Sequence, residues 1–193
     1  MGRTNQASAL SNLGMVQQRL GRYEDALVSY QEGLAILVEL DNRHGQGECL
    51  VNIADVYERL GRYEEALRYS VGSLEVYESL ADRLGHAEAL RQLGVVYQRL
   101  GRHQDAVDHL QRSLAMHTEL GDPHGQAETL RDLGAAQAAA GRRPEARRHW
   151  TDALAIMERL EIPEADDVRA SSPAEPACRA RWGRLGCPAT RDL

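Results

Sequence analysis

The sequence predicts an all-α solenoid built from four helix-turn-helix units and followed by a flexible C-terminal tail. Three observations predict this fold class: the chain repeats itself every 40 residues, the apolar residues inside each repeat have helical spacing, and a glycine stands at the same place in every repeat. Self-similarity at a fixed period is typical of repeat architectures, in which each unit buries its apolar face against its neighbours. We therefore expect a stack of helix pairs instead of one compact core.

The repeat is visible as six positions that recur in four units without an insertion or deletion. Three of these positions hold leucine, one holds glycine, one arginine and one alanine. The aligned sets are Leu10, Leu50, Leu90 and Leu130; Gly21, Gly61, Gly101 and Gly141; Arg22, Arg62, Arg102 and Arg142; Ala26, Ala66, Ala106 and Ala146; Leu34, Leu74, Leu114 and Leu154; and Leu40, Leu80, Leu120 and Leu160. Independent sequences would not produce this register.

Each unit begins with a first helix, whose apolar residues recur three and four positions apart, as Leu50, Ile53 and Tyr57 do in the second unit. This helix is predicted to end at the repeated glycine, here Gly61, because glycine adopts the left-handed conformation that closes a helix. A second helix follows after a very short turn. In the last unit Pro144 stands near its start, where the missing N–H is harmless.

Polar, turn-forming segments join one unit to the next, and their length suits connections between packed antiparallel helices. They set the expected organisation of the chain, with one repeat array and one tail. The array spans residues 5–162 in units of about 5–44, 45–84, 85–124 and 125–162, and the Pro/Ala/Arg-rich tail spans 163–193.

The two ends of the array are predicted to be weakly covered. The tail composition favours disorder, with at best a short helix that docks Trp182 and Leu185 on the last repeat. The last helix exposes Ile156 and Met157 unless something covers them, and no helix precedes the first unit. We therefore expect either a fragment of a longer array or a protein that associates with itself through its uncapped ends.

The helix pairs and their repeated positions resemble the tetratricopeptide repeat (TPR) in its 40-residue form. Such repeats are found in bacterial STAND-type regulators with NB-ARC domains and in G-protein-signalling-modulator-like scaffolds. The residues that carry the resemblance are Leu13-Gly14, Leu93-Gly94, Leu133-Gly134, Tyr57, Tyr97 and Ala26. The departures are Ala54, Gln17, Gln137, Gly33 and Gly72. The resemblance covers residues 5–162 and implies a right-handed α-solenoid whose first helices line an inner, concave surface.

Composition and charge exclude several function classes. The chain has 23 basic residues, all arginine, against 29 acidic residues, and its net charge is −6. Without lysine there is no Walker-A phosphate loop, no Schiff-base enzyme and no Ser-x-x-Lys nucleophile. The lysine-dependent carboxylate clamp of chaperone-binding relatives is absent too. An acidic chain also lacks the electrostatic footprint for direct nucleic-acid binding, and no apolar run is long enough to span a membrane.

The cysteines and the short motifs of the chain also narrow its location and its possible chemistry. Three cysteines at irregular spacing suit unpaired thiols in a reducing cytoplasm, and residues 1–20 lack the apolar segment of a secretory signal. No His-Glu-x-x-His or Cys-x-x-Cys spacing occurs, so we expect no metal and no cofactor. No nucleophile elbow is recognisable either, and we expect no enzyme activity. A catalytic group assembled from distant repeats is the alternative, since fold alone excludes nothing.

The candidate binding surface is the concave groove. Asn12 and Asn52 stand just before the Leu-Gly position, where similar repeats use an asparagine to hold a bound peptide's backbone, because a carboxamide both donates and accepts hydrogen bonds. Gln92 is a close substitute, and Asp132 is a poorer one because an ionised carboxylate only accepts. With the charged residues of the same face, the predicted partner-binding set is Asn12, Asn52, Asp55, Arg59, Arg91, Gln92, Arg99, Arg131 and Asp132.

Two arginines of this set allow two interpretations. Arg91 and Arg131 recur one repeat apart, at the roughly 10 Å spacing of packed helices, and could bracket acidic side chains of a partner. Alternatively, Glu88 and Glu128 already pair with them as surface contacts three residues apart, worth about 0.2–0.5 kcal/mol each.

The sequence thus favours a non-catalytic protein-interaction scaffold that binds a peptide segment of a protein partner in the groove. One alternative is an effector-sensing TPR arm, or a fragment, of a STAND-type signalling or transcriptional regulator. Another is a self-assembling solenoid, suggested by the uncapped ends.

Overall fold

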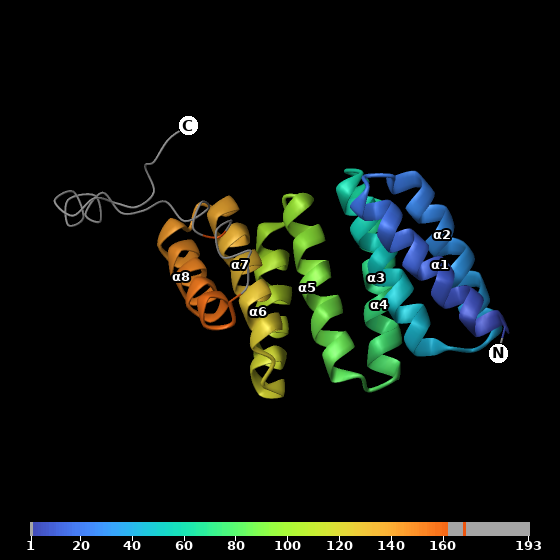
Figure 1. Cartoon of the computed structure of the whole chain (residues 1–193). Helices are drawn as coiled ribbons and strands as arrows, with labels where there is room; N and C mark the ends of the chain where they lie inside the picture. Colours follow the sequence, from blue (N-terminus) through green and yellow to red (C-terminus); the bar gives the residue numbers. More distant parts are fainter. Residues whose placement is uncertain (1, 162–167, 169–193) are drawn as a thin grey trace.

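The computed structural model describes residues 2–161 and residue 168, and these form helices without any strand (Figure 1). The helices are α1 (Gly2–Arg19), α2 (Tyr23–Glu39), α3 (Arg43–Arg59), α4 (Tyr63–Ser79), α5 (Arg83–Arg99), α6 (His103–Leu120), α7 (Pro123–Ala139) and α8 (Arg143–Arg159). The predicted all-α solenoid of helix pairs is therefore confirmed. Within the described residues, no helix has the length and apolar character that crossing a membrane requires. The expected docking of Trp182 and Leu185 lies outside the described residues.

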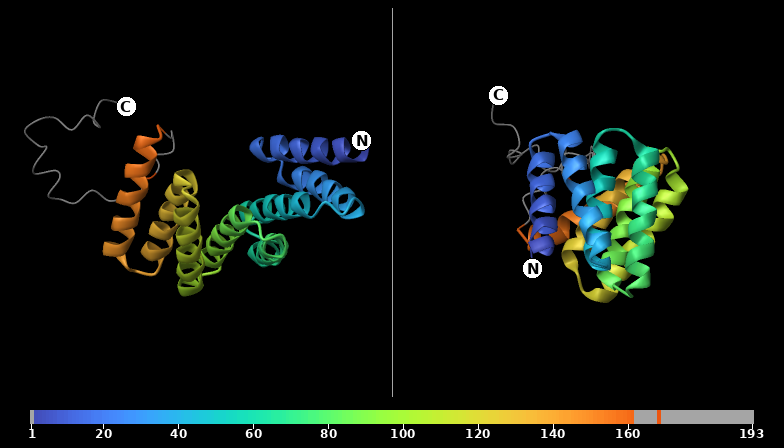
Figure 2. Two further views of the ribbon diagram at one scale, coloured as in Figure 1. Left: turned by 90° about the horizontal axis from the view of Figure 1, so that it is seen from below. Right: turned by 90° about the vertical axis from the view of Figure 1, so that its right-hand side faces the viewer.

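The helices stack in two layers. Each first helix packs on the second helix of its own unit, and each second helix packs on the first helix of the next unit. Successive first helices also contact each other (α1 with α3, α3 with α5, α5 with α7), whereas in the described chain no two second helices make an extended contact. The first helices therefore form the inner layer. The helix axes turn along the array, so that α8 lies steeply across α1 (Figure 2).

The repeated glycines end the first helices as predicted. Gly21, Gly61, Gly101 and Gly141 have φ values of 72°, 72°, 73° and 78°, in the left-handed region. The arginine that follows two of them, Gly61 and Gly101, has a role that the sequence did not reveal. In the second unit, Arg62 pairs with Glu65 at 2.8 Å and lies over the ring of Tyr57, 4.7 Å from its centroid. Arg102 makes the same two contacts with Asp105 and Tyr97.

A second set of left-handed residues follows the second helices, and the sequence pattern did not predict it. Asp41, Ala81, Gly121 and Glu161 have φ values of 50°, 52°, 65° and 55°. Only one of the four is glycine, so three of them hold a conformation that a Cβ disfavours. The residue after each of the first three caps the next helix: the side chains of Asn42, Asp82 and Asp122 accept a hydrogen bond from the backbone N–H three residues on.

The residue at the glycine of the Leu-Gly pair depends on the size of the side chain that faces it from the second helix. A Cβ at Gly14 would lie 2.8 Å from the ring of Tyr30, and one at Gly94 would lie 2.6 Å from Cγ of Leu110. At Gly134 it would collide with Trp150. In the second unit, where alanine replaces glycine, the residue at the facing position is the small Ser70. The departure at Ala54 is thus matched by a smaller side chain opposite.

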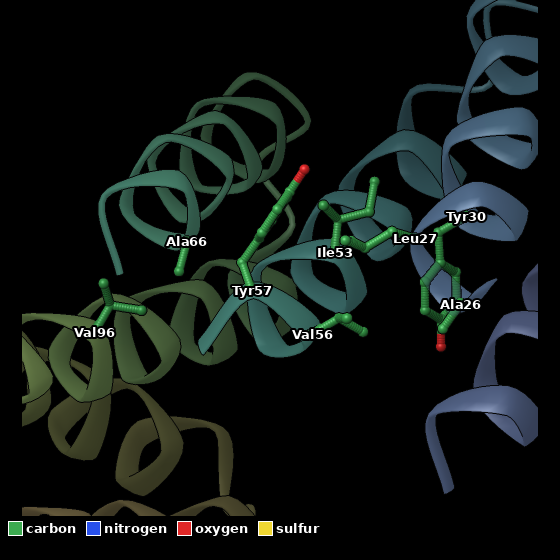
Figure 3. Packing of buried hydrophobic residues seen from close by; sticks show 8 residues of the cluster. All are labelled: Ala26, Leu27, Tyr30, Ile53, Val56, Tyr57, Ala66 and Val96. Atoms are coloured by element: carbon green, nitrogen blue, oxygen red, sulfur yellow. The ribbon is translucent and has the colours of Figure 1, made fainter. Parts of the chain in front are cut away.

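The core runs between units. In Figure 3, Ala26, Leu27 and Tyr30 of α2 meet Ile53 and Val56 of α3 in one buried cluster. Since the second helix of one unit covers the first helix of the next, each unit depends on its neighbours.

The C-terminal end of the array is better covered than the sequence suggested. Met157 is 1% exposed, and it packs in a cluster with Trp150, Ala153 and Val168, which is itself 1% exposed. Ile156 is half-buried. The sequence predicted that Met157 is exposed unless another segment covers it, and Val168, which follows α8, packs in the same cluster.

Candidate functional site

Several of the predicted site residues tie neighbouring first helices together. Asp55 of α3 accepts a hydrogen bond from Gln18 of α1. Arg99 of α5 reaches back to Glu58 of α3, with 2.5 Å between Nε and Oε1. Arg91 of α5 reaches forward to α7. The inner layer therefore uses part of its polar surface to fix the spacing of its own helices.

Arg91 is the centre of a buried ion-pair cluster. Its Nη1 lies 2.8 Å from Oδ2 of Asp132, and its Nη2 lies 2.5 Å from Oε1 of Glu88 and 3.7 Å from Oε2 of Glu128. Only 13% of the Arg91 side chain is exposed. Arg131 completes the cluster through Asp132, with 2.9 Å between Nη2 and Oδ1. Arg91 is thus positioned to stabilise the α5–α7 contact, and its buried guanidinium is poorly placed to bracket acidic groups of a partner.

The electrostatics of this cluster follow from burial and proximity. Burial alone would raise the pKa of Glu88, but the guanidinium of Arg91 outweighs it and the pKa of that carboxyl is lowered. Burial opposes the charge of Arg91, yet Glu88 and Asp132 raise the pKa of its guanidinium. Three carboxylates, of Glu88, Glu128 and Asp132, stand against two arginines, so the formal charge of the cluster is negative.

The other predicted arginines are more exposed. Arg59 donates from Nε to Oδ2 of Asp55 at 2.9 Å, and half of its side chain remains in solvent. Arg99 is similarly exposed beyond its contact with Glu58. Both keep a carboxylate neighbour, so a partner that paired with either arginine would compete with an internal ion pair.

The amide row behaves differently from the charges. Asn12 is exposed and Asn52 half-buried, and neither side chain has a hydrogen-bond partner among the residues that the structure describes. Gln92 is 6% exposed, and its buried Nε2 also lacks a partner within that part of the chain. Asp132, at the fourth position of the row, is held by Arg91 and Arg131. The unused hydrogen-bonding capacity therefore lies in the first three units.

A pocket of about 200 Å³ lies beside the first of these amides, between α1 and the start of α3. It is lined by Ala7, Ser8, Ser11, Asn12, Leu37, Asn42, Gly45 and Glu48. Near it, Ser11 Oγ lies 3.5 Å from Sγ of Cys49, a buried thiol whose pKa burial raises. Asn42 and Leu37 come from α2 and its following turn, which is why helix periodicity did not place them beside Asn12. Hydroxyls, amides and one carboxylate give this pocket hydrogen-bonding chemistry of neutral to acidic character.

Across residues 2–161 and 168, histidine, cysteine, aspartate and glutamate nowhere gather in threes in a way that could hold a metal ion.

Comparison with known proteins places the architecture. A sequence model of the tetratricopeptide repeat matches three overlapping stretches, at residues 5–79, 50–119 and 85–159. No curated protein matches the sequence. Among solved structures, BtubC (BKLC) from P. vanneervenii is similar at 22% identity and a TM-score of 0.66, covering 97% of this chain and 69% of that one. A Rap protein complexed with Competence and Sporulation Factor is similar at 17% identity and a TM-score of 0.80, covering 93% and 50%.

Aspartyl phosphate phosphatase F from Bacillus subtilis is similar at 13% identity and a TM-score of 0.79, covering 94% of this chain and 49% of that one. At such identities the likeness shows the fold alone. The chain spans about half the length of the Rap protein and of phosphatase F.

Proposed function

The chain belongs to the tetratricopeptide-repeat family, whose repeats build protein-interaction scaffolds, and we propose that it is a non-catalytic module that holds a peptide segment of a protein partner along its inner layer. The observation that carries this proposal is the pair of unused, solvent-accessible amides at Asn12 and Asn52, whereas Gln92 of the same row is buried. A carboxamide matches the donor and acceptor of a peptide unit, so one amide in each of the first two repeats can hold an extended backbone.

The charges of the inner layer define the kind of segment that fits. The Arg91 cluster is net negative, and Glu48 is the charged residue of the pocket beside Asn12, with 62% of its side chain exposed. An acidic segment would face these carboxylates, whereas a neutral or basic one would not. We therefore propose a partner segment that is uncharged or basic, which replaces the bracketing of acidic groups by Arg91 and Arg131.

The best test compares amides on the two layers. The partner is captured from the native cell with the full chain, its bound segment is located by cross-linking, and the synthetic segment is titrated calorimetrically. The Asn12→Ala/Asn52→Ala variant should bind at least about fivefold more weakly, since each lost hydrogen bond is worth about 0.5–1.5 kcal/mol. The matched control is Gln31→Ala/Gln111→Ala, which removes two exposed amides from second helices.

Two results would count against the proposal. Equal affinity of the asparagine variant and the wild type, with intact helicity, would move the site away from the inner layer. Tighter binding after lysines and arginines of the segment are changed to glutamate would contradict the charge assignment.

A second candidate is the sensor arm of a signalling regulator. The Rap protein of similar fold was solved in complex with Competence and Sporulation Factor, which favours a groove of this architecture as a receiver of signalling ligands. Gene neighbourhood separates the two candidates, because an adjacent ATPase or transcription-factor frame is expected only for the sensor arm.

A further inference from the structure

The outer side of α1 carries an apolar stripe that the described chain leaves open. Its residues, Gln6, Ala9, Leu13, Val16 and Leu20, are all exposed, and we refer to them as the α1 stripe. Leu13, Val16 and Leu20 are 47%, 54% and 67% exposed. The stripe positions alternate three and four residues apart, which is the heptad spacing of a helix that packs along its length on another helix.

The other units show that this stripe belongs to a helix contact. The equivalents of Leu13 and Val16 are Ile53 and Val56 in α3, and both are completely buried. In α5 the equivalents Leu93 and Val96 are at most 2% exposed. In each interior unit the covering surface is the second helix of the unit before, as Figure 3 shows for α2 over α3. In α1, which lies at the end of the array in Figure 1, the same positions face outward.

The opposite end of the array is a poor match for the stripe. In α2 the residue that lies over Ile53 and Val56 is Leu27, and its equivalent in α8 is Arg147. Val168 already packs on the α8 cluster. Head-to-tail stacking of two copies would therefore bury a guanidinium against leucine and disturb a packed valine, so an open-ended filament is disfavoured.

The stripe is instead compatible with itself. The charged residues of α1 are Arg3 and Arg19, and the helix contains no carboxylate. A parallel pair of α1 helices would set each arginine beside its own copy. An antiparallel pair centred between Leu13 and Val16 places Leu13 opposite Val16 and Ala9 opposite Leu20, and it keeps Arg3 and Arg19 of the two copies apart. We propose that the α1 stripe is the contact surface of a two-fold symmetric dimer in which two copies of α1 pack antiparallel.

The predicted dimer is weak, because one helix face is smaller than the roughly 1,200 Å² that stable interfaces bury, and we expect a dissociation constant of about 10–100 µM. Sedimentation equilibrium of the full chain over a series of concentrations up to about 1 mM covers this range. Val16→Glu sets two carboxylates next to each other at the centre of the contact and should weaken the dimer at least about tenfold. The control is Val28→Glu on α2, because Val28 is 55% exposed and so matches Val16.

Each outcome decides the proposal. A reversible dimer that Val16→Glu weakens and Val28→Glu leaves unchanged supports it. A monomer at every concentration, a dimer that Val16→Glu does not affect, or assemblies that grow beyond two copies would overturn it. A monomer that uses the stripe for another protein's helix would overturn it as well. Leu20→Glu gives an independent second variant, since neither substitution removes a buried contact.

Discussion

The clearest quantitative prediction concerns the third unit, where we would introduce the residue pair of the second. The second unit combines Ala54 with Ser70, and the third combines Gly94 with Leu110. If the size of the facing side chain decides which residue is tolerated at the Leu-Gly position, Gly94→Ala should change sign when Leu110 becomes serine. The experiment is a double-mutant cycle of Gly94→Ala and Leu110→Ser.

The magnitude follows from the distances. In Gly94→Ala the new Cβ would lie 2.6 Å from Leu110 Cγ, 3.0 Å from Leu110 Cδ2 and 3.2 Å from the Ala106 carbonyl oxygen. Such overpacking costs about 1–3 kcal/mol, and alanine returns about 1 kcal/mol in helix propensity, so we expect a net loss of about 1 kcal/mol and at most about 2 kcal/mol. With serine at 110 the two contacts with the leucine side chain are removed, and the same substitution should stabilise by up to about 1 kcal/mol. The coupling energy is therefore about 2 kcal/mol and at most about 3 kcal/mol.

Urea unfolding followed by circular dichroism gives the four free energies of unfolding. Leu110→Ser alone should cost about 3–5 kcal/mol, because it leaves a cavity in a fully buried site. Gly72→Ala is the control, since the nearest atom to its Cβ is 3.8 Å away and only propensity should act, stabilising by about 0.5–1 kcal/mol. If Gly94→Ala costs the same with leucine and with serine at 110, Leu110 is not the reason for the glycine.

Three further predictions concern backbone strain and pH. Ala81→Gly should stabilise the protein and Gly61→Ala should destabilise it, each by about 1 kcal/mol in urea unfolding, because both residues have a left-handed backbone that a Cβ disfavours. A Cβ at position 61 meets no atom within 4 Å, so only this backbone strain should act there. Because the pKa of Glu88 is lowered, its carboxylate stabilises the folded state above about pH 4.5, and this stabilisation is lost as the pH falls below that value. Arg91→Met should remove this acid dependence and cost about 3–5 kcal/mol of folding stability at neutral pH. Burial raises the pKa of Tyr30 and of Tyr77 to about 12, so the stability present below pH 10 should fall between pH 10 and 12, and Tyr77→Phe should reduce that fall in an alkaline melt. Free energies of unfolding equal to that of the wild type would contradict the first of these predictions. The same loss of stability with pH in variant and wild type would contradict the other two.

The fold could be predicted from the sequence because its determinants are local and repeated. Gly61 alone indicates the end of a helix, and the spacing of Leu50 and Ile53 indicates a buried stripe. Ala81 carries no such signal, because alanine does not favour the left-handed conformation that it has in the structure, with φ of 52°. The burial of Met157 was equally hidden, because it depends on Val168, which belongs to no repeat.

The candidate site could be predicted only in part. Periodicity identifies the row from Asn12 to Asp132, but it does not say which members are already satisfied. The spacing of Glu88 and Arg91 allowed an ion pair between them, but it did not show that Asp132 and Glu128 approach Arg91 from α7. Which charges meet between helices depends on the distance between their axes, and a single sequence does not contain that distance.

The central claim is that the amides of the inner layer hold the backbone of a partner, and the side-chain resonances of these amides test it most directly. With the partner segment titrated into labelled protein, the carboxamide signals of Asn12 and Asn52 should shift and saturate with the calorimetric affinity, while those of Gln31 and Gln111 on the outer layer should stay in place. Shifts confined to the outer-layer glutamines, with Asn12 and Asn52 unmoved at saturation, would contradict the account.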